Sequence, residues 1–244
     1  LDSWMHSDTI GRTVLHWAVD YPEPKCLEIL LKRVPASCVN EPDNQDMSPL
    51  AWACNHGHTA HVRLLLARGA DLGQRNVTGR SPAHFASCHE DPSCMALLLR
   101  ADLACVMHQD NDGRTPLHNA CTYGSLEVAR LIMEACLRLE TDPRFENNLQ
   151  CCDDMDRTPL HCAAVSGRLD LVRELLVRGH NPQTLDKQHH LPIWYARIKQ
   201  HTDIVSLLAT AMVRQHNSQQ VLLSRSTTNI HMQDMSDDDD EDDA

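Results

Sequence analysis

The side chains in this sequence that could carry out chemistry are its 16 histidines and 11 cysteines. Imidazole and thiolate groups bind zinc when they recur at characteristic spacings, and histidine also serves as a general acid or base. The sequence has no Cys-x-x-Cys pair, and neither His56 with His58 nor His189 with His190 has further ligands at a zinc spacing. A glycine-rich phosphate loop and a Gly-x-Ser-x-Gly turn are also missing. These patterns predict a protein that is not an enzyme and that uses no metal or cofactor.

Four histidines instead share one recurring sequence context. The clearest copy begins at Thr115 and reads Thr-Pro-Leu-His, and it follows a turn signal that ends in Gly113. Proline suits the first position of a helix, and Gly124 is placed to end that helix before a second, amphipathic one. Related segments begin at six positions, namely Thr13, Ser48, Ser81, Thr115, Thr158 and Leu191. The motif histidines within them are His16, His84, His118 and His161.

The six segments are 33 to 43 residues apart, and this period, with a turn and two helices in each copy, resembles the ankyrin repeat. The resemblance covers residues 8–213. It implies an all-α solenoid of about six helix-turn-helix repeats with β-turn fingers. In ankyrin repeats the motif histidine forms hydrogen bonds within and between neighbouring turns, so we expect a structural role for these four side chains. Copy one and the Asp-Gly-Arg-Thr-Pro-Leu-His segment are also similar to the arrays of inversin-like ciliary scaffolds.

The repeat register predicts the organisation of the chain. Residues 1–7 are a flank or the end of a preceding repeat, and residues 214–244 are an acidic tail that we expect to be disordered. The fourth copy holds about ten extra residues, and residues 141–148 within it read as an exposed loop. The predicted repeats span residues 8–42, 43–75, 76–109, 110–152, 153–185 and 186–213.

Composition limits the classes of partner. The net charge is −12, and residues 234–244 carry eight acidic side chains and no basic ones. No basic face is evident, so direct binding to nucleic acid is not expected. No stretch approaches 18 uninterrupted apolar residues, so insertion into a membrane is not expected either. The dispersed cysteines, such as Cys54 and Cys121, fit small buried hydrophobic positions and a reducing compartment.

Two rows of side chains are candidates for contacting a partner. The residue before each Thr or Ser lies at a turn, and four of these residues are arginines: Arg12, Arg80, Arg114 and Arg157. Such a row could bind carboxylates, although arginine is also a common solution for a solvated ankyrin turn. Eight residues after the Thr or Ser, four copies carry a ring: Tyr21, His56, His89 and Tyr123. The ankyrin resemblance implies that both rows face the concave groove, so we predict that they bind the partner.

We therefore predict a monomeric, non-catalytic scaffold or adaptor that binds a partner protein, in the cytoplasm, the nucleus or the cilium. Two alternatives remain open. The chain could regulate a transcription factor or signalling protein, or it could be the cytosolic array of a larger enzyme or membrane protein. The acidic tail could solubilise the chain, bind a basic partner, or fold back over Arg12, Arg80 and Arg114.

Overall fold

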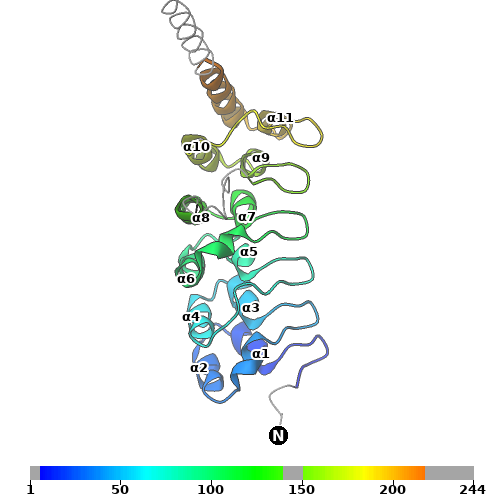
Figure 1. Ribbon diagram of the computed structural model, residues 1–244, viewed down its shortest axis with the longest axis vertical. Coiled ribbons are helices and arrows are strands. Elements are labelled where there is room, and N and C mark those ends of the chain that lie inside the picture. The colour runs from blue at the N-terminus through cyan, green and yellow to red at the C-terminus, as the bar shows by residue number, and fades with distance from the viewer. Residues whose placement is uncertain (1–5, 140–150, 218–244) are drawn as a thin grey trace, which may run out of the picture.

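The computed structural model describes residues 6–139 and 151–217, and the regular elements in these ranges are helices. First helices stack in one column and second helices in another, and a row of hairpin-like fingers projects from the first column (Figure 1). The predicted ankyrin solenoid is confirmed. Its helix pairs are α1 (Val14–Asp20) with α2 (Lys25–Leu31), α3 (Pro49–Asn55) with α4 (Thr59–Ala67), α5 (Pro82–Ala86) with α6 (Ser93–Ala101), α7 (Pro116–Thr122) with α8 (Leu126–Leu139), α9 (Pro159–Val165) with α10 (Leu169–Val177), and α11 (Pro192–Ile198) with a helix over residues 202–217.

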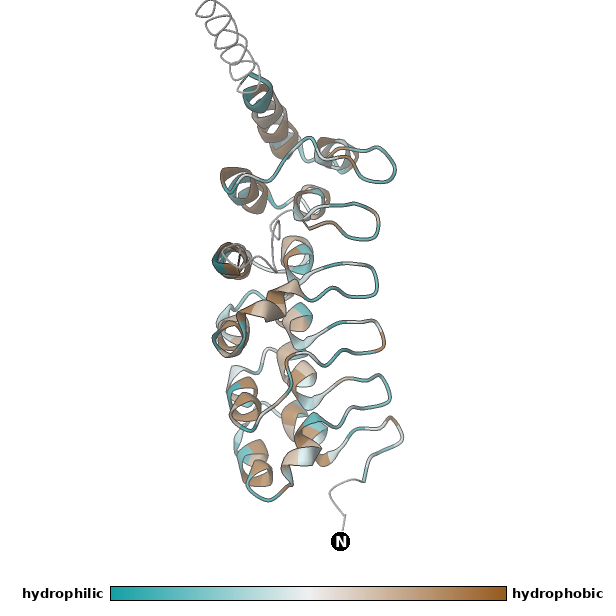
Figure 2. Cartoon of the chain, in the orientation of Figure 1, coloured by the Kyte–Doolittle hydropathy of each residue, from teal (hydrophilic) through white to brown (hydrophobic). Residues whose placement is uncertain are grey.

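The hydrophobic core runs along the array between the two columns. In α7, Leu117, Ala120 and Cys121 are at most 1% exposed, and α8 buries Ile132 and Met133 against them. Hydrophobic residues are concentrated on the helices, and the fingers are mostly hydrophilic (Figure 2). Burial of one such large side chain contributes roughly 2 kcal/mol, and each repeat gains this energy mainly from its neighbours.

Two features differ from the sequence expectations, and several expectations concern residues outside the described ranges. Residues 214–217 were expected to be part of a disordered tail, but they are helical. Short 3-10 helices, η2 (Ala36–Asn40) and η3 (Leu103–Met107), connect the first repeat to the second and the third to the fourth. The predicted loop over residues 141–148, most of the flank over residues 1–7 and most of the acidic tail lie outside the described residues.

Each finger is closed by the residue with which it begins. The side-chain Oδ1 of that Asp or Asn accepts hydrogen bonds of 2.8–3.1 Å from the backbone N–H groups two and four residues later. The fourth finger residue adopts a left-handed φ of 57–82°, whether it is glycine or not. The closing residues are Asp8, Asp43, Asn76, Asp110, Asp153 and Asp186.

Neighbouring fingers are joined by one backbone hydrogen bond each. For example, the N–H of Asn111 donates to the carbonyl of Thr78 at 3.0 Å, and the N–H of Asp154 donates to the carbonyl of Asp112 at 2.9 Å. Equivalent bonds join the other described neighbours. The fingers therefore form a continuous ladder rather than six independent loops.

The motif histidines bind two repeats together, as the sequence predicted. In the fourth repeat, the backbone N–H of Thr115 donates to Nδ1 of His118 at 3.2 Å, while Nε2 of the same ring lies 3.0 Å from the carbonyl oxygen of Arg157 in the next finger. All four motif histidines are 0% exposed. The equivalent carbonyls belong to Met47 for His16, Arg114 for His84 and His190 for His161. Each ring therefore fixes both the start of its own first helix and the position of the next finger.

We predict that the array loses stability between pH 7 and pH 5. Burial lowers the pKa of His84 and of His118 from 6.5 to about 4, which is only partly opposed by their hydrogen bonds to the next finger. The unfolded chain therefore binds more protons than the folded chain in this interval. The contribution of the two neutral, buried imidazoles to the stability of the array is fully present above pH 6.5 and is lost as the pH falls towards 4. Each of these two histidines should lower the free energy of unfolding by about 2 kcal/mol between pH 7 and pH 5, measured by urea denaturation.

The substitution His118→Gln provides the control for this pH dependence. It should reduce the slope of unfolding free energy against pH by about one bound proton at pH 5. A slope that stays the same in the variant would contradict a neutral, buried imidazole at this position.

Candidate functional site

The candidate interaction surface is the finger face, which we define as the inner side of the fingers together with the exposed side of the first helices. It is best developed in the first two repeats. The Arg12 guanidinium lies 3.9 Å from the ring centroid of Trp17 and 5.8 Å from that of Trp52. The Trp52 ring in turn stacks on His56 at 5.4 Å. Cation–π contact and ring stacking therefore join side chains from two repeats into one surface.

Carboxylates hold this aromatic surface in place. Asp8 forms a 2.9 Å ion pair with Nε of Arg12, and Asp43 accepts a 2.9 Å hydrogen bond from Nε1 of Trp52. Oδ1 of each aspartate closes its own finger, and Oδ2 orients a side chain of the finger face. The surface is thus ordered before any partner arrives, which lowers the entropic cost of binding.

The other predicted arginines are also paired with finger aspartates. Arg157 lies 2.7 Å from Oδ2 of Asp153, Arg114 lies 3.8 Å from the same oxygen, and Arg80 lies 3.6 Å from Asp110. Burial alone would raise the pKa of the Asp153 carboxyl, but the hydrogen bonds and charge of Arg157 outweigh burial, and the pKa is lowered. The arginine row is therefore not a row of uncompensated positive charge.

The fingers as a whole carry more negative than positive charge. Their six five-residue segments contain nine aspartates against four arginines and one lysine. Asp46, Asp112, Asp154 and Asp156 are exposed, whereas the four arginines are half-buried. The electrostatics of the finger face consequently favour a neutral or basic partner surface over an acidic one.

The row at the end of the first helices divides into two kinds of residue. Tyr21 and Tyr123 are 62% and 55% exposed. His89 instead places Nε2 3.0 Å from the carbonyl oxygen of Asn55 and so joins the second and third repeats. His56 lies between these cases, because its Nδ1 is 2.8 Å from the carbonyl of Trp52 while its Nε2 lies 3.6 Å from Asp20. The two tyrosines are thus the members of this row most available to a partner.

One aromatic row was missed in the sequence. Trp17, Trp52 and Phe85 each lie four residues after the Thr or Ser of their copy. The two tryptophans contact Arg12 on the finger face, whereas Phe85 is half-buried and packs against the core. A tally of residue types at every repeat position, rather than at two positions, would have found them. The last copy carries Tyr195 at the same place, and its hydroxyl donates to Asp186.

Among residues 6–139 and 151–217, no group of three or more His, Cys, Asp or Glu side chains is arranged to hold a metal ion. The eleven cysteines all lie within these described residues and are thiols rather than disulfides. Burial raises the pKa of Cys105 to about 12, so this thiol stays protonated at neutral pH and is a poor nucleophile.

We predict that Asp153→Ala destabilises the array by about 2–4 kcal/mol, because it leaves two finger N–H groups and Arg157 without their acceptor and removes the carboxylate 3.8 Å from Arg114. Asp153→Asn should cost less, since Asn76 closes the third finger with an amide oxygen. Exposed Asp154→Ala is the matched control, with an effect within about 0.5 kcal/mol. Urea denaturation at pH 7 measures all three, and equal effects of the two alanine variants would contradict the closing role of Asp153.

Comparisons with known proteins agree with this geometry. A sequence model described as ankyrin repeats (3 copies) matches residues 2–76, 69–143 and 132–221. Human inversin is 33% identical over 141 residues, which is 55% of this chain and 13% of inversin. The Drosophila melanogaster transient receptor potential cation channel subfamily A member 1 is 28% identical over 213 residues, 81% of this chain and 17% of the channel. The mouse nuclear factor NF-kappa-B p105 subunit is 32% identical over 149 residues, 60% of this chain and 14% of p105.

The chain thus spans less than a fifth of the length of each of these relatives. Within its described residues, no helix is both long enough and apolar enough to cross a membrane. The matched segments cover most of the sequence, and the helix pairs, fingers and buried motif histidines repeat in the same register. This chain belongs to the ankyrin repeat family, whose arrays are protein-binding scaffolds.

Proposed function

We propose that this chain is a non-catalytic scaffold or adaptor whose finger face binds a partner protein. The observation that carries the proposal is the aromatic surface of the first two repeats, where Trp17 is 42% and Tyr21 62% exposed although both are large and partly apolar. Tryptophan, tyrosine and arginine are enriched at the energetically dominant positions of protein interfaces. Arg12 and Trp52 hold this surface in one arrangement.

The partner that fits this face has an apolar patch flanked by basic or neutral groups. The rings supply contact area, and the exposed Asp20 lies 3.6 Å from the ring of His56, where it can receive positive charge. The residues proposed to contact the partner remain Arg12, Tyr21, His56, Arg80, His89, Arg114, Tyr123 and Arg157, now joined by Trp17, Trp52 and Phe85. We place the chain in the cytoplasm or nucleus as a monomer.

Regulatory binding of a transcription factor is the second candidate. The 32% identity to the NF-kappa-B p105 subunit over 149 residues favours it over an enzymatic role. Both candidates use the same surface, and the identity of the captured partner separates them.

We predict that the double variant Trp17→Ala/Tyr21→Ala loses its partner. Truncation of two hot-spot rings costs about 2 kcal/mol or more, which is at least a thirtyfold loss of affinity. The measurement is affinity purification of the full chain from cell extract with quantitative mass spectrometry, followed by titration of the purified partner.

The matched control is Ile29→Ala, because Ile29 on α2 is exposed to a similar extent, 47%, but belongs to the second-helix column. It should retain the partner. A circular-dichroism melt establishes that each variant is folded. Equal retention by the double variant and the control would contradict the assignment of the finger face.

A further inference from the structure

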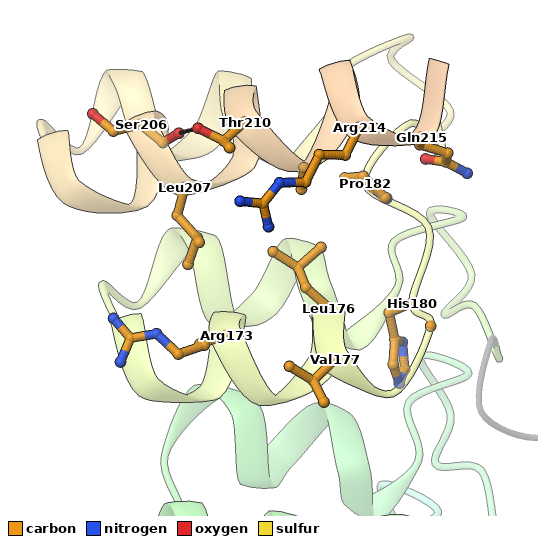
Figure 3. Close-up of a pocket in the computed structure, with 12 residues that line it drawn as sticks. Arg173, Leu176, Val177, His180, Pro182, Ser206, Leu207, Thr210, Arg214 and Gln215 are labelled. Atoms are coloured by element: carbon orange, nitrogen blue, oxygen red, sulfur yellow. Dashed lines mark hydrogen bonds between the residues drawn. The ribbon is translucent and has the colours of Figure 1, made fainter. Parts of the chain in front are cut away.

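An apolar groove lies at the far end of the array, outside the finger face. It is formed between α10 and the helix over residues 202–217, and its volume is about 700 Å³. In Figure 3 the side chains of Leu176 and Val177 lie on one side of this groove and Leu207 on the other. Pro182 closes one end of it. The groove is therefore large enough to receive several side chains of an extended or helical segment.

One apolar side chain that lines the groove is unusually exposed to solvent. Val177 is 80% exposed, the largest exposed fraction among the large hydrophobic residues described. Leu176, next to it, packs against the core. An exposed apolar wall beside a hollow is typical of a surface that is covered by another segment.

The polar groups of the groove point to the charge of the covering segment. Two of the residues that line it are arginines, Arg173 and Arg214, and none is acidic. Arg214 reaches from the 202–217 helix into the gap between the two helices (Figure 3). Burial lowers the pKa of His180 to about 4, so this lining ring is neutral at pH 7 and the positive charge comes from the arginines.

Two buried polar atoms of the lining residues have no hydrogen-bond partner within the described residues. They are Nε2 of His180 and Oε1 of Gln215. A buried polar atom without a partner costs about 1–3 kcal/mol. Both atoms are themselves buried, so an occupant of the groove would reach them only after the lining side chains move.

The chain itself contains a segment of matching chemistry. Ile230, Met232 and Met235 supply apolar side chains at short intervals, and residues 234–243 carry eight carboxylates. The segment begins thirteen residues after residue 217, a length of chain that reaches up to about 40 Å. Because the groove is lined by residues as late as Gln215, the tether is long enough to bring the segment back to it, at an effective concentration of about millimolar.

Alternative targets for the acidic segment are less favourable. The finger arginines already pair with aspartates of the fingers, and the finger face carries net negative charge. The groove combines apolar walls with arginines and has no acidic lining residue, and its Arg173 makes only a long, exposed contact of 4.0 Å with Asp170.

We propose that residues 230–243 bind in this groove of their own chain. Ile230, Met232 and Met235 contact Leu176, Val177 and Leu207, and the carboxylates that follow face Arg173 and Arg214. The contact covers the end of the array while leaving the finger face open. A partner segment with the same apolar and acidic pattern competes for the groove.

Methyl NMR on the full chain tests this contact. With ¹³C-labelled Met, Leu and Val methyl groups, we expect nuclear Overhauser contacts from Met232 or Met235 to Val177 or Leu207 at low salt. In 0.5 M NaCl the docked population should fall, because the charge pairs are screened. Absence of these contacts at low salt would overturn the proposal.

Two exposed valines provide matched variants. Val177→Glu puts a carboxylate in the groove and should lower the docked population at least tenfold, whereas Val213→Glu, at a 60% exposed position that does not line the groove, should leave it unchanged. Unchanged finger amide signals show that both variants are folded. Contacts that persist in Val177→Glu would contradict the site.

A second variant and a mixed sample complete the test. Replacement of Asp237, Asp238, Asp239 and Asp240 by Asn should weaken docking, which is read from the chemical shift of the Leu207 methyl groups. An unchanged shift would refute the role of charge.

In an equal mixture of labelled and unlabelled chains, contacts confined to one chain support the proposal. Contacts between chains would overturn it in favour of a second copy as the occupant.

Discussion

The bond from a motif histidine to the carbonyl of the next finger is the interaction on which the arrangement of this array depends. Each such ring is fully buried, and its two nitrogens serve two repeats at once. Because an imidazole is flat and rigid, the bond sets the distance and the angle between a first helix and the following finger. In the second copy Ala51 stands at this position, and there the finger ladder and the bond from His89 to Asn55 hold the repeats together.

This rigidity explains how a small set of exposed side chains can act as a surface. The closing aspartates form the finger with one oxygen and orient an arginine, a tryptophan or a tyrosine with the other. The charge on the finger arginines is thereby largely compensated within the array. What remains for a partner is a pre-arranged set of rings in the first repeats, edged by the exposed aspartates of the finger tips.

The sequence predicts the features that repeat and misses those that depend on pairs of distant residues. The register and the helix pairs follow from the spacing of the copies, and the structural role of His16, His84, His118 and His161 follows from the ankyrin resemblance. The pairing of Arg80 with Asp110 does not, because the two residues belong to different fingers. The expected disorder after residue 213 was wrong for residues 214–217, where the last helix continues beyond the point at which the repeat pattern ends. The non-glycine residues Asp46 and Asp156 adopt the left-handed turn because their fingers are closed by Asp43 and Asp153.

The most direct test of this account is to determine the tautomer of the four motif histidines. The ¹⁵N chemical shifts of the imidazole rings show which ring nitrogen carries the proton. The backbone N–H that donates to Nδ1 requires this atom to be an acceptor, so the proton must lie on Nε2, where it donates to the next finger. We expect neutral, Nε2-protonated rings at pH 7, and the rings of His84 and His118, whose pKa burial lowers to about 4, should remain neutral at pH 5.5. Nδ1-protonated rings, or titration of all four near pH 6.5, would contradict the claim that these histidines join the repeats.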